Sequence, residues 1–176
     1  MEKNELRKEI RSRKRQFSAE ELRVQSLSLI SRLLVHPRIE QANTVMLYHS
    51  LPDEVDTHTA IDRLAACGKR VLLPVVLDEE RMEVREYRDQ ACLQTGSMNI
   101  LEPMGRPFQT LEEIDVIVVP GMSFDADGHR LGRGKGYYDR FLQQVPKAYK
   151  IGICFDFQKV DYVPSDQYDI PVNEVI

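Results

Sequence analysis

Glycine and basic residues alternate in one short segment of the chain, Arg130-Leu-Gly-Arg-Gly-Lys-Gly-Tyr-Tyr-Asp139. Five of the nine glycines lie between residues 121 and 136. Glycine permits positive φ angles and close approach of the backbone to a ligand, and the segment leads into a predicted helix, residues 137–145, whose first amides favour an anion. Because Arg133 and Lys135 alternate with the last three glycines, two positive charges would flank the backbone N–H groups. The segment therefore predicts a phosphate-binding loop.

Known phosphate motifs do not match this segment. A P-loop would need glycine at position 129, where His129 stands, and Ser or Thr at position 136, where Gly136 stands. The spacing of the last three glycines also differs from GxGxxG, and the segment lies late in the chain. A glycine loop can also be a series of tight turns with a structural role only. The interleaved Arg and Lys favour the phosphate interpretation.

Asp139 lies in the first turn of the predicted helix, where a carboxylate complements the helix dipole. Beside bound phosphates, the same carboxylate would repel them unless a divalent cation lay between. Magnesium is commonly held by one or two carboxylates together with phosphate oxygens, so Asp139 is a conditional magnesium ligand. The nearby Asp125-Ala-Asp-Gly128 is not an EF-hand loop, because Gly136 stands where the twelfth-position Glu would be. A hairpin turn at residues 127 and 128 explains it better.

An acidic loop, Leu51-Pro-Asp-Glu-Val-Asp-Thr57, follows a predicted strand at residues 44–49. Its default interpretation is a solvated turn, with Thr57 capping the next helix. If that strand neighbours the strand before Gly121, Glu54 and Asp56 would face the same cleft as the glycine loop. They could then accept hydrogen bonds from a substrate rich in N–H groups.

Basic residues outnumber acidic ones at the N-terminus, where seven Lys and Arg stand among three Glu within residues 2–15. A solvated helix face is the usual explanation. An RNA-contacting arm lacks interleaved aromatic residues for base stacking. Alternatively, Lys3 and Arg7, one helical turn apart, could both reach a nucleotide phosphate. The four histidines have no metal or triad spacing, and no Ser or Cys lies in a nucleophile elbow, so covalent catalysis is not indicated.

Hydrophobic periodicity predicts an α/β fold with a mixed sheet. Residues 2–16 form an exposed basic helix, and Ser18 with Glu21 is a capping box for a second helix that stops at His36-Pro37. A strand at 44–49, a helix ending near Gly68 and a strand at 70–76 have the length of a βαβ unit, which implies a parallel pair. Further strands are expected at residues 82–87, 98–101, 115–119 and 149–155.

Composition narrows the class of protein. The 176 residues fit one domain, and 42% are hydrophobic and 30% charged. The net charge of −4 argues against broad binding to nucleic acid or anionic lipid. The three cysteines suggest neither a disulfide framework nor a zinc site. With no apolar segment long enough for a membrane and a charged N-terminus, we expect a cytoplasmic protein.

Four segments together resemble the 5-formyltetrahydrofolate cyclo-ligase (methenyltetrahydrofolate synthetase) family, and the similarity covers nearly the whole chain. They are Lys3-x-x-x-Arg7, Leu51-Pro-Asp-Glu-Val-Asp-Thr57, Pro120-Gly-Met-Ser-Phe124 and, most specific, Arg130 to Asp139. The resemblance implies a three-layer α/β/α fold similar to the sugar-phosphate isomerase and CoA-transferase group. It also implies a magnesium- and ATP-dependent enzyme that converts 5-formyltetrahydrofolate into 5,10-methenyltetrahydrofolate, releasing ADP and phosphate through an imidate phosphate intermediate.

The resemblance also assigns residues, in a single domain spanning 1–176. Lys135, Arg133 and Tyr138 would be catalytic, and Asp139 and Asp169 would bind magnesium. Residues expected to bind ATP are Lys3, Arg7, Arg130, Leu131, Gly132, Arg133, Gly134, Lys135, Gly136, Tyr137 and Tyr138. Residues expected to bind the folate, with or without a polyglutamate tail, are Leu51, Glu54, Asp56, Met98, Arg133, Gly134, Lys135, Gly136 and Tyr137.

Two departures from the family pattern and two competing functions accompany these expectations. Asp56 stands where the family often has Glu, and Met98 stands where some relatives carry an aromatic residue over the pterin. A sugar-phosphate isomerase on a related fold would have a similar phosphate loop but need no ATP. A non-catalytic nucleotide- or RNA-binding module would use the basic helix. We expect a monomer that binds neither nucleic acid nor membrane.

Overall fold

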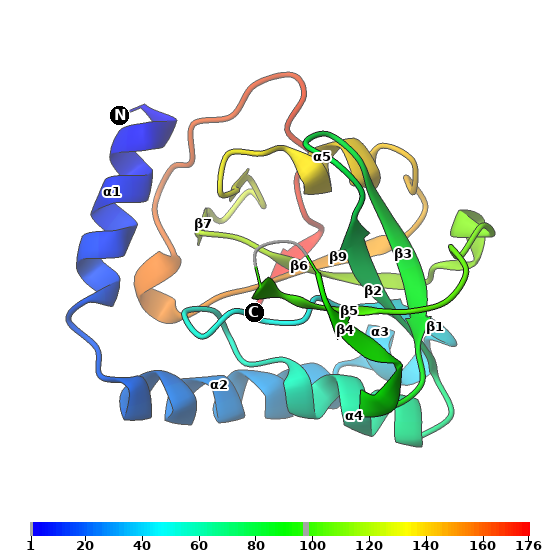
Figure 1. Ribbon diagram of the computed structural model, residues 1–176. Helices are drawn as coiled ribbons and strands as arrows, with labels where there is room; N and C mark the ends of the chain where they lie inside the picture. Colours follow the sequence, from blue (N-terminus) through cyan, green and yellow to red (C-terminus); the bar gives the residue numbers. More distant parts are fainter. Residues whose placement is uncertain (1, 97–98) are drawn as a thin grey trace.

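The computed structural model describes residues 2–96 and 99–176, and its centre is a six-stranded sheet (Figure 1). The strand order is β10-β9-β6-β1-β2-β3. All neighbours are parallel except β2 and β3. The strands of this sheet are β1 (Thr44–Met46), β2 (Arg70–Val76), β3 (Met82–Tyr87), β6 (Val116–Pro120), β9 (Tyr149–Ile153) and β10 (Glu174–Val175). The expected α/β fold with a mixed, largely parallel sheet is confirmed.

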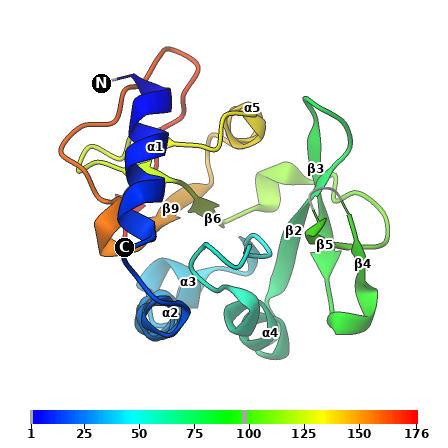
Figure 2. The same cartoon turned by 60° about the vertical axis from the view of Figure 1, so that its left-hand side comes forward.

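Helices cover both faces of this sheet, as Figures 1 and 2 show. Because the central strands are buried on both sides, they are apolar throughout, and alternate residues enter opposite cores. In β1, Val45 packs with the first core and Met46 with the second. The first core is covered by α2 (Ala19–Leu34), α3 (Pro37–Gln41) and α4 (His58–Ala66), and the second by α5 (Tyr137–Leu142). The result is three layers.

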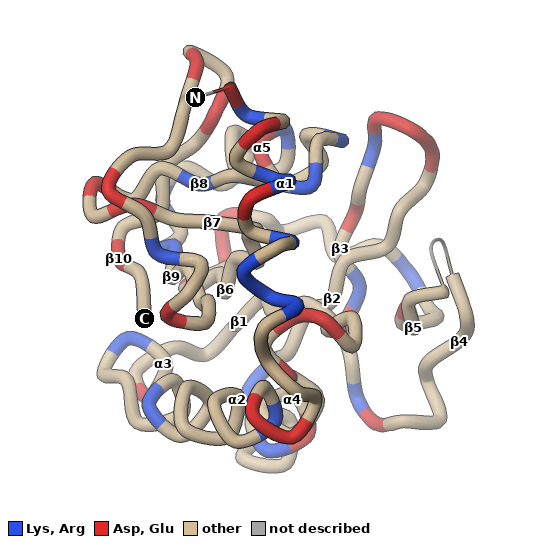
Figure 3. The backbone as a smooth tube through the Cα atoms, turned by 90° about the vertical axis from the view of Figure 1, so that its left-hand side faces the viewer, with Lys and Arg blue, Asp and Glu red and all other residues tan. Residues whose placement is uncertain are grey.

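The basic N-terminal helix, α1 (Lys3–Lys14), lies beside the sheet rather than on either face. We expected an exposed helix, but its thin apolar stripe is fully buried. Leu6 and Ile10 have no exposed surface and pack in a third cluster with Met122, Leu131 and Val163. Two apolar residues one turn apart are enough to dock the helix, and most of the other residues of α1 are Lys, Arg or Glu (Figure 3).

The capping box predicted for α2 is present: Ser18 Oγ accepts from Glu21 N, and Glu21 Oε2 accepts from Ser18 N. Thr57 is the N-cap residue of α4, as predicted, but its side chain makes no hydrogen bond to the first turn. Thr57 Oγ1 donates instead to the Tyr48 carbonyl, and Asp56 Oδ1 accepts from His58 N. Strand β1 ends at Met46 rather than at residue 49.

Short strands complete the fold. A second sheet pairs β4 (Leu93–Thr95) with β5 (Leu101–Pro103), and the extended piece expected at 98–101 is therefore shifted toward its C-terminal side. Residue Met98 lies outside the described residues. The predicted hairpin turn after residue 125 is present, joining β7 (Ser123–Phe124) to β8 (Arg130–Leu131). Three short 3-10 turns are also described, at Gln90–Cys92, Leu111–Glu113 and Asp156–Gln158.

Two predicted elements near the C-terminus are shorter than expected. Helix α5 ends at Leu142 instead of residue 145. Pro146 disfavours a helical conformation at Val145, the last residue of the predicted helix. Strand β9 ends at Ile153 instead of residue 155. Across residues 2–96 and 99–176, the structure contains no helix long and apolar enough to cross a membrane.

Candidate functional site

A cavity of about 280 Å³ lies between α1 and the glycine loop that joins β8 to α5. It gathers residues from the N-terminus, from positions 130–139 and from the loop before β10. The lining residues are Lys3, Arg7, Arg130, Leu131, Gly132, Arg133, Gly134, Lys135, Gly136, Tyr137, Tyr138, Asp139 and Asp169. Every residue expected to bind ATP or magnesium is therefore in one place.

Glycines shape the floor of this cavity. Gly134 and Gly136 have φ angles of 110° and 70°, which residues with a Cβ rarely adopt. Gly136 is the N-cap of α5, so its conformation ends the loop and begins the helix. Arg7 Nε donates to the Gly132 carbonyl at 2.9 Å, and the Arg7 guanidinium lies against Gly134. Helix α1 and the loop are thus held together by the residue predicted to contact a phosphate.

Positive charge predominates in the cavity, although the whole chain has a net charge of −4. Five lining residues are cationic, and only Asp139 and Asp169 are acidic. A neighbouring groove of about 430 Å³ is lined by Asn4, Arg7, Lys8, Arg11, Arg133, Gly134 and Lys135, with no carboxylate. Because α5 has only six residues, these side-chain charges rather than its helix dipole supply most of the attraction for an anion.

Asp169 is held by the N-terminal helix. Lys3 Nζ donates to Asp169 Oδ2 at 2.5 Å and to Asp166 Oδ2 at 2.8 Å. Partial burial lowers the pKa of Lys3, but the hydrogen bonds to Asp166 and Asp169 outweigh it, so the pKa is raised and Lys3 stays charged. Asp169 Oδ1 makes no hydrogen bond within the described chain, which leaves one carboxylate oxygen available for a cation.

Asp139 is paired with Arg130 at the inner end of the cavity. Arg130 Nη2 donates to Asp139 Oδ2 at 2.9 Å, and Ile170 N donates to Asp139 Oδ1 at 3.2 Å. Arg130 Nη1 donates to the Pro120 carbonyl at the C-terminal end of β6. The side chain of Arg130 is 5% exposed and that of Asp139 is 17% exposed. The pair fixes the first turn of α5 against the sheet.

Two buried polar atoms at this place have no hydrogen-bond partner among the described residues: Nε of Arg130 and the hydroxyl of Tyr138. Burial is the main cause that raises the pKa of Tyr138 far above its usual value, and the negative charge of Glu54 adds to it. Tyr138 therefore remains a hydrogen-bond donor at neutral pH. Buried polar groups in proteins are nearly always satisfied, and a polar ligand in the cavity would give these two atoms partners.

The acidic loop after β1 reaches the glycine loop through Arg133. Strands β1 and β6 are parallel neighbours, which fulfils the condition for a shared cleft. Arg133 Nε and Nη2 donate to Glu54 Oε1 at 3.1 and 2.9 Å, and Nη2 also donates to Asp53 at 2.8 Å. Glu54 Oε2 accepts from Leu51 N, so Leu51 is held near the same contact.

Not every residue expected from sequence joins this arrangement. Asp56 caps α4 through His58 N, and its side chain is 57% exposed. Asp53 and Lys14, which pair with each other at 2.8 Å, were not expected in the site. The sequence signal for Asp53 was its place in the same acidic run as Glu54; for Lys14 there was none beyond its positive charge.

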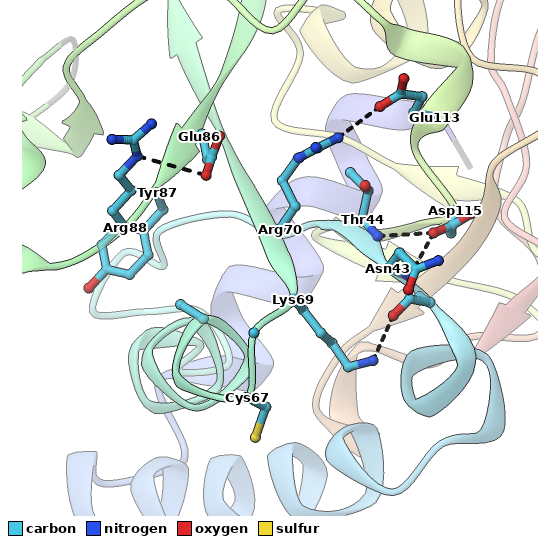
Figure 4. A pocket seen from close by; sticks show the side chains of 13 residues that line it. Asn43, Thr44, Cys67, Lys69, Arg70, Glu86, Tyr87, Arg88, Glu113 and Asp115 are labelled. Atoms are coloured by element: carbon cyan, nitrogen blue, oxygen red, sulfur yellow. Dashed lines mark hydrogen bonds and ion pairs between the residues drawn. The ribbon is translucent and has the colours of Figure 1, made fainter.

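A larger concave surface, of about 860 Å³, lies at the opposite edge of the sheet, where β1 and β2 begin (Figure 4). Its charged groups bind one another or the backbone. Arg70 pairs with Glu113 at 2.7 Å, and Lys69 Nζ donates to the carbonyls of Glu40 and Ala42. Asp115 accepts from the backbone N–H groups of Asn43 and Thr44. These groups organise the edge of the sheet.

Comparison with known proteins gives one consistent result. A model of the 5-formyltetrahydrofolate cyclo-ligase family matches residues 1–176. The chain is 34% identical over 173 residues to 5-formyltetrahydrofolate cyclo-ligase of Escherichia coli (strain K12), covering 95% of each. It is 33% identical over 187 residues to that of Mus musculus, covering 99% of this chain and 92% of the relative.

Solved structures agree in fold over the same length. The structure of 5,10-methenyltetrahydrofolate synthetase from Aquifex aeolicus superposes with a TM-score of 0.87 at 38% identity, covering 99% of this chain and 89% of the other. The enzyme of that name from Mycoplasma pneumoniae gives a TM-score of 0.80 at 27% identity, covering 100% and 98%.

Proposed function

The chain belongs to the 5-formyltetrahydrofolate cyclo-ligase family, and from that premise we propose how its own residues carry out the reaction. The enzyme converts 5-formyltetrahydrofolate into 5,10-methenyltetrahydrofolate with consumption of ATP. The observation that carries the assignment of roles is the cavity between α1 and the glycine loop, with its five cations and two unpartnered buried polar atoms.

The triphosphate of ATP fits this cavity by charge and by hydrogen-bond capacity. Lys3 and Arg7 approach from α1, and Arg133 and Lys135 from the glycine loop, while the loop backbone supplies N–H groups. Lys135 has no hydrogen bond or ion pair from its ammonium within the described residues, so its charge is free for a phosphate. The Tyr138 hydroxyl and Arg130 Nε would gain the acceptors that they lack.

Magnesium fits the carboxylates of the same cavity. The ion prefers oxygen ligands and is usually held by one or two carboxylates together with phosphate oxygens. Asp169 Oδ1 is open, whereas both oxygens of Asp139 already accept hydrogen bonds. Asp169 would therefore hold the ion directly, with Asp139 as the second carboxylate after a shift of Arg130. When bound, magnesium offsets phosphate charge and fixes the orientation of the phosphates.

The reaction needs no protein nucleophile. The formyl oxygen of the substrate attacks the γ-phosphorus of ATP, and the bond to the β-phosphate oxygen breaks, which releases ADP and leaves an imidate phosphate. The neighbouring folate nitrogen, which does not carry the formyl group, then attacks the formyl carbon and loses its proton. Phosphate leaves with the electrons of the C–O bond. Arg133, Lys135 and Tyr138 stabilise charge on the transferring group and hold the reactants in line.

The folate would lie between the acidic loop and the glycine loop. Leu51 and Glu54 are held at this junction by the contacts of Glu54 with Leu51 N and Arg133. Asp56 lies two residues further along the same loop. We assign these three residues, with Arg133 to Tyr137 of the glycine loop, to the folate, and the predicted contact of Met98 stays a prediction. No nucleic acid or membrane partner is part of the proposal.

We also propose that the protein acts as a monomer in the cytoplasm. Its three cysteines are free, as a reducing compartment would keep them, and Cys154 is buried within the second core. Burial raises the pKa of the Cys154 thiol to about 12, so this cysteine is an inert core residue.

The test of the proposed function follows the absorbance of methenyltetrahydrofolate after 5-formyltetrahydrofolate, ATP and magnesium are mixed with the protein. The proposal expects product only when all three are present, with one ADP formed for each product molecule. Product formed equally well without ATP would contradict it. ATP binding without product would contradict the enzymatic proposal and favour a nucleotide-binding module.

A further inference from the structure

Asp53 connects three segments of the chain that are far apart in sequence. Its Oδ2 accepts from Lys14 Nζ at 2.8 Å, and its Oδ1 accepts from Arg133 Nη2 at 2.8 Å. Lys14 is the last residue of α1, and Arg133 lies in the glycine loop. Partial burial raises the pKa of Asp53, but the contacts with Lys14 and Arg133 outweigh it and lower the pKa overall. Asp53 is therefore ionised at neutral pH and holds both cations.

The carboxylates hold Arg133 along one edge of its guanidinium. Nε and Nη2 donate to Glu54 and Asp53. Nη1 makes no hydrogen bond to any of residues 2–96 and 99–176, and Arg133 lines both the 280 Å³ cavity and the adjoining groove. A guanidinium is planar and rigid, so binding at one edge fixes the direction of the other. The free side of Arg133 is thus aimed by the contacts that Asp53 and Glu54 make.

The second contact of Asp53 anchors the far end of α1. This helix brings Lys3 and Arg7 into the cavity from its first turns, and its only fully buried residues are Leu6 and Ile10. Lys3 pairs with Asp169 at one end of the helix and Lys14 pairs with Asp53 at the other. A twelve-residue helix fixed at both ends keeps the positions of the side chains between them.

We propose that Asp53 is a positioning residue for ATP, which aims Arg133 at the phosphates and holds α1 so that Lys3 and Arg7 reach the same cavity. The inference rests on the proposed function. Asp53 itself does not touch ATP, since phosphates would repel its carboxylate and its two oxygens are already occupied by Arg133 and Lys14.

Asp53→Asn is the direct test, with Glu113→Gln as a matched control. The substitution Asp53→Asn keeps the size of the side chain but removes the charge that holds Arg133 and Lys14. Glu113 also forms a half-exposed ion pair, with Arg70 at the opposite edge of the sheet. We expect Asp53→Asn to lower kcat/KM for ATP about tenfold. The KM for 5-formyltetrahydrofolate should rise less, because the folate is affected only through Arg133 and not through Lys3 or Arg7. Glu113→Gln should match wild type in both.

Two further variants separate positioning from a general structural role. Asp53→Glu restores the charge and should recover most of the lost kcat/KM for ATP. Lys14→Met breaks only the contact with α1, so it should raise the KM for ATP and leave kcat near wild type; it also serves as the test if Asp53→Asn does not fold. Thermal melting of every variant shows whether folding has changed.

Calorimetric titration with Mg-ATP in the absence of folate distinguishes failure of this inference from failure of the proposed function. We expect the dissociation constant to rise about tenfold in Asp53→Asn, whether or not the wild-type protein turns over the folate. Wild-type affinity and wild-type kcat/KM for ATP in Asp53→Asn would overturn the inference. Equal losses in Asp53→Asn and Glu113→Gln would also overturn it, because the effect would then be common to any half-exposed pair.

Discussion

The two concave surfaces of this molecule differ in what their charged groups do. The larger, about 860 Å³, contains Lys69, Arg70, Arg88 and three carboxylates. Its charged side chains pair with one another, as Arg70 does with Glu113, or bind backbone groups nearby, as Lys69 does. The smaller, about 280 Å³, has more cations than carboxylates and two buried polar atoms that lack a partner among the residues that the structure describes. Volume and unsatisfied polar groups therefore favour different surfaces.

The two surfaces differ in whether their charged groups have partners within the protein. At the larger one, Arg70 and Glu113 neutralise each other, and Asp115 satisfies two backbone N–H groups at the start of β1. At the smaller one, Lys135 is unpaired within the described chain, and the cations lie where a shared edge of parallel strands places ligands. Unsatisfied charge and hydrogen-bond capacity favour the smaller cavity as the ligand site, because buried polar groups in folded proteins nearly always have partners.

The largest effect should come from Lys135→Ala. Its ammonium makes no hydrogen bond or ion pair with a described residue, so the fold should be unchanged. Loss of the charge facing the transferring phosphoryl group should lower kcat by about a hundredfold or more. Lys69→Ala is the counterpart at the larger surface. It removes hydrogen bonds to two carbonyls and should cost some stability but leave kcat unchanged. Steady-state kinetics with thermal melting checks both, and wild-type turnover in Lys135→Ala would remove this residue from the mechanism.

Replacing Asp139 and Asp169, the two expected magnesium ligands, should distinguish an effect on magnesium binding from an effect on stability. Asp139→Ala leaves the buried Arg130 without its partner, so unfolding should become easier by about 3 kcal/mol, and ATP affinity that depends on magnesium should fall. Asp169→Asn should raise the magnesium concentration needed for half-maximal activity with a smaller loss of stability, because Lys3 is 30% exposed. Chemical denaturation and magnesium titrations give the two readouts. Unchanged magnesium titrations in both variants would contradict a role in magnesium binding and would show that both residues are structural only.

Tyr138→Phe should change stability and activity in opposite directions. The hydroxyl is buried and has no partner in residues 2–96 and 99–176, so its removal should stabilise the ligand-free protein by about 1 kcal/mol. In the complex the same hydroxyl would bond the ligand, and kcat/KM should fall about tenfold. Denaturation curves and kinetics of the same preparation test this prediction. A variant that loses stability would show that the hydroxyl already has a partner in solution.

The smallest effect concerns His49, which stacks on His58 at 4.0 Å outside both surfaces. Burial is the main cause that lowers the pKa of His49 to about 4, and the charge of His58 adds to it. Because the folded pKa is below the unfolded value, this group contributes stability that is present above the unfolded pKa and lost as the pH falls toward 4. Replacing His49 with Phe should make stability less dependent on pH between about 6.5 and 4. Parallel slopes for both proteins over this range would contradict the assignment.

Local signals account for what could be predicted from sequence. Ser18 and Glu21 defined the start of α2, and the apolar run at 70–76 gave the bounds of β2, because both depend on nearby residues. Strand β10 has two residues and forms only because β9 provides its partner, so no local pattern marks it. Thr57 was predicted as a cap by its type, but the Tyr48 carbonyl in the folded chain offered it a better partner.

The candidate site also has features that local sequence predicts and features that depend on tertiary packing. The glycine loop and its cations could be found from sequence, because their spacing is local and unusual. The pairing of Arg130 with Asp139, and of Arg133 with Asp53 and Glu54, depends on how distant segments pack and could not be read from spacing. The parallel contact of β1 with β6 decides that the acidic loop meets the glycine loop.

Backbone amide chemical shifts recorded by NMR during a titration with Mg-ATP test the central claim most directly, because each surface contains its own glycines. Gly132, Gly134 and Gly136 line the smaller cavity, and Gly68 lines the larger surface. We predict that the three loop glycines shift in a saturable manner while Gly68 does not move. Saturable shifts at Gly68 with the loop glycines unchanged would contradict the account.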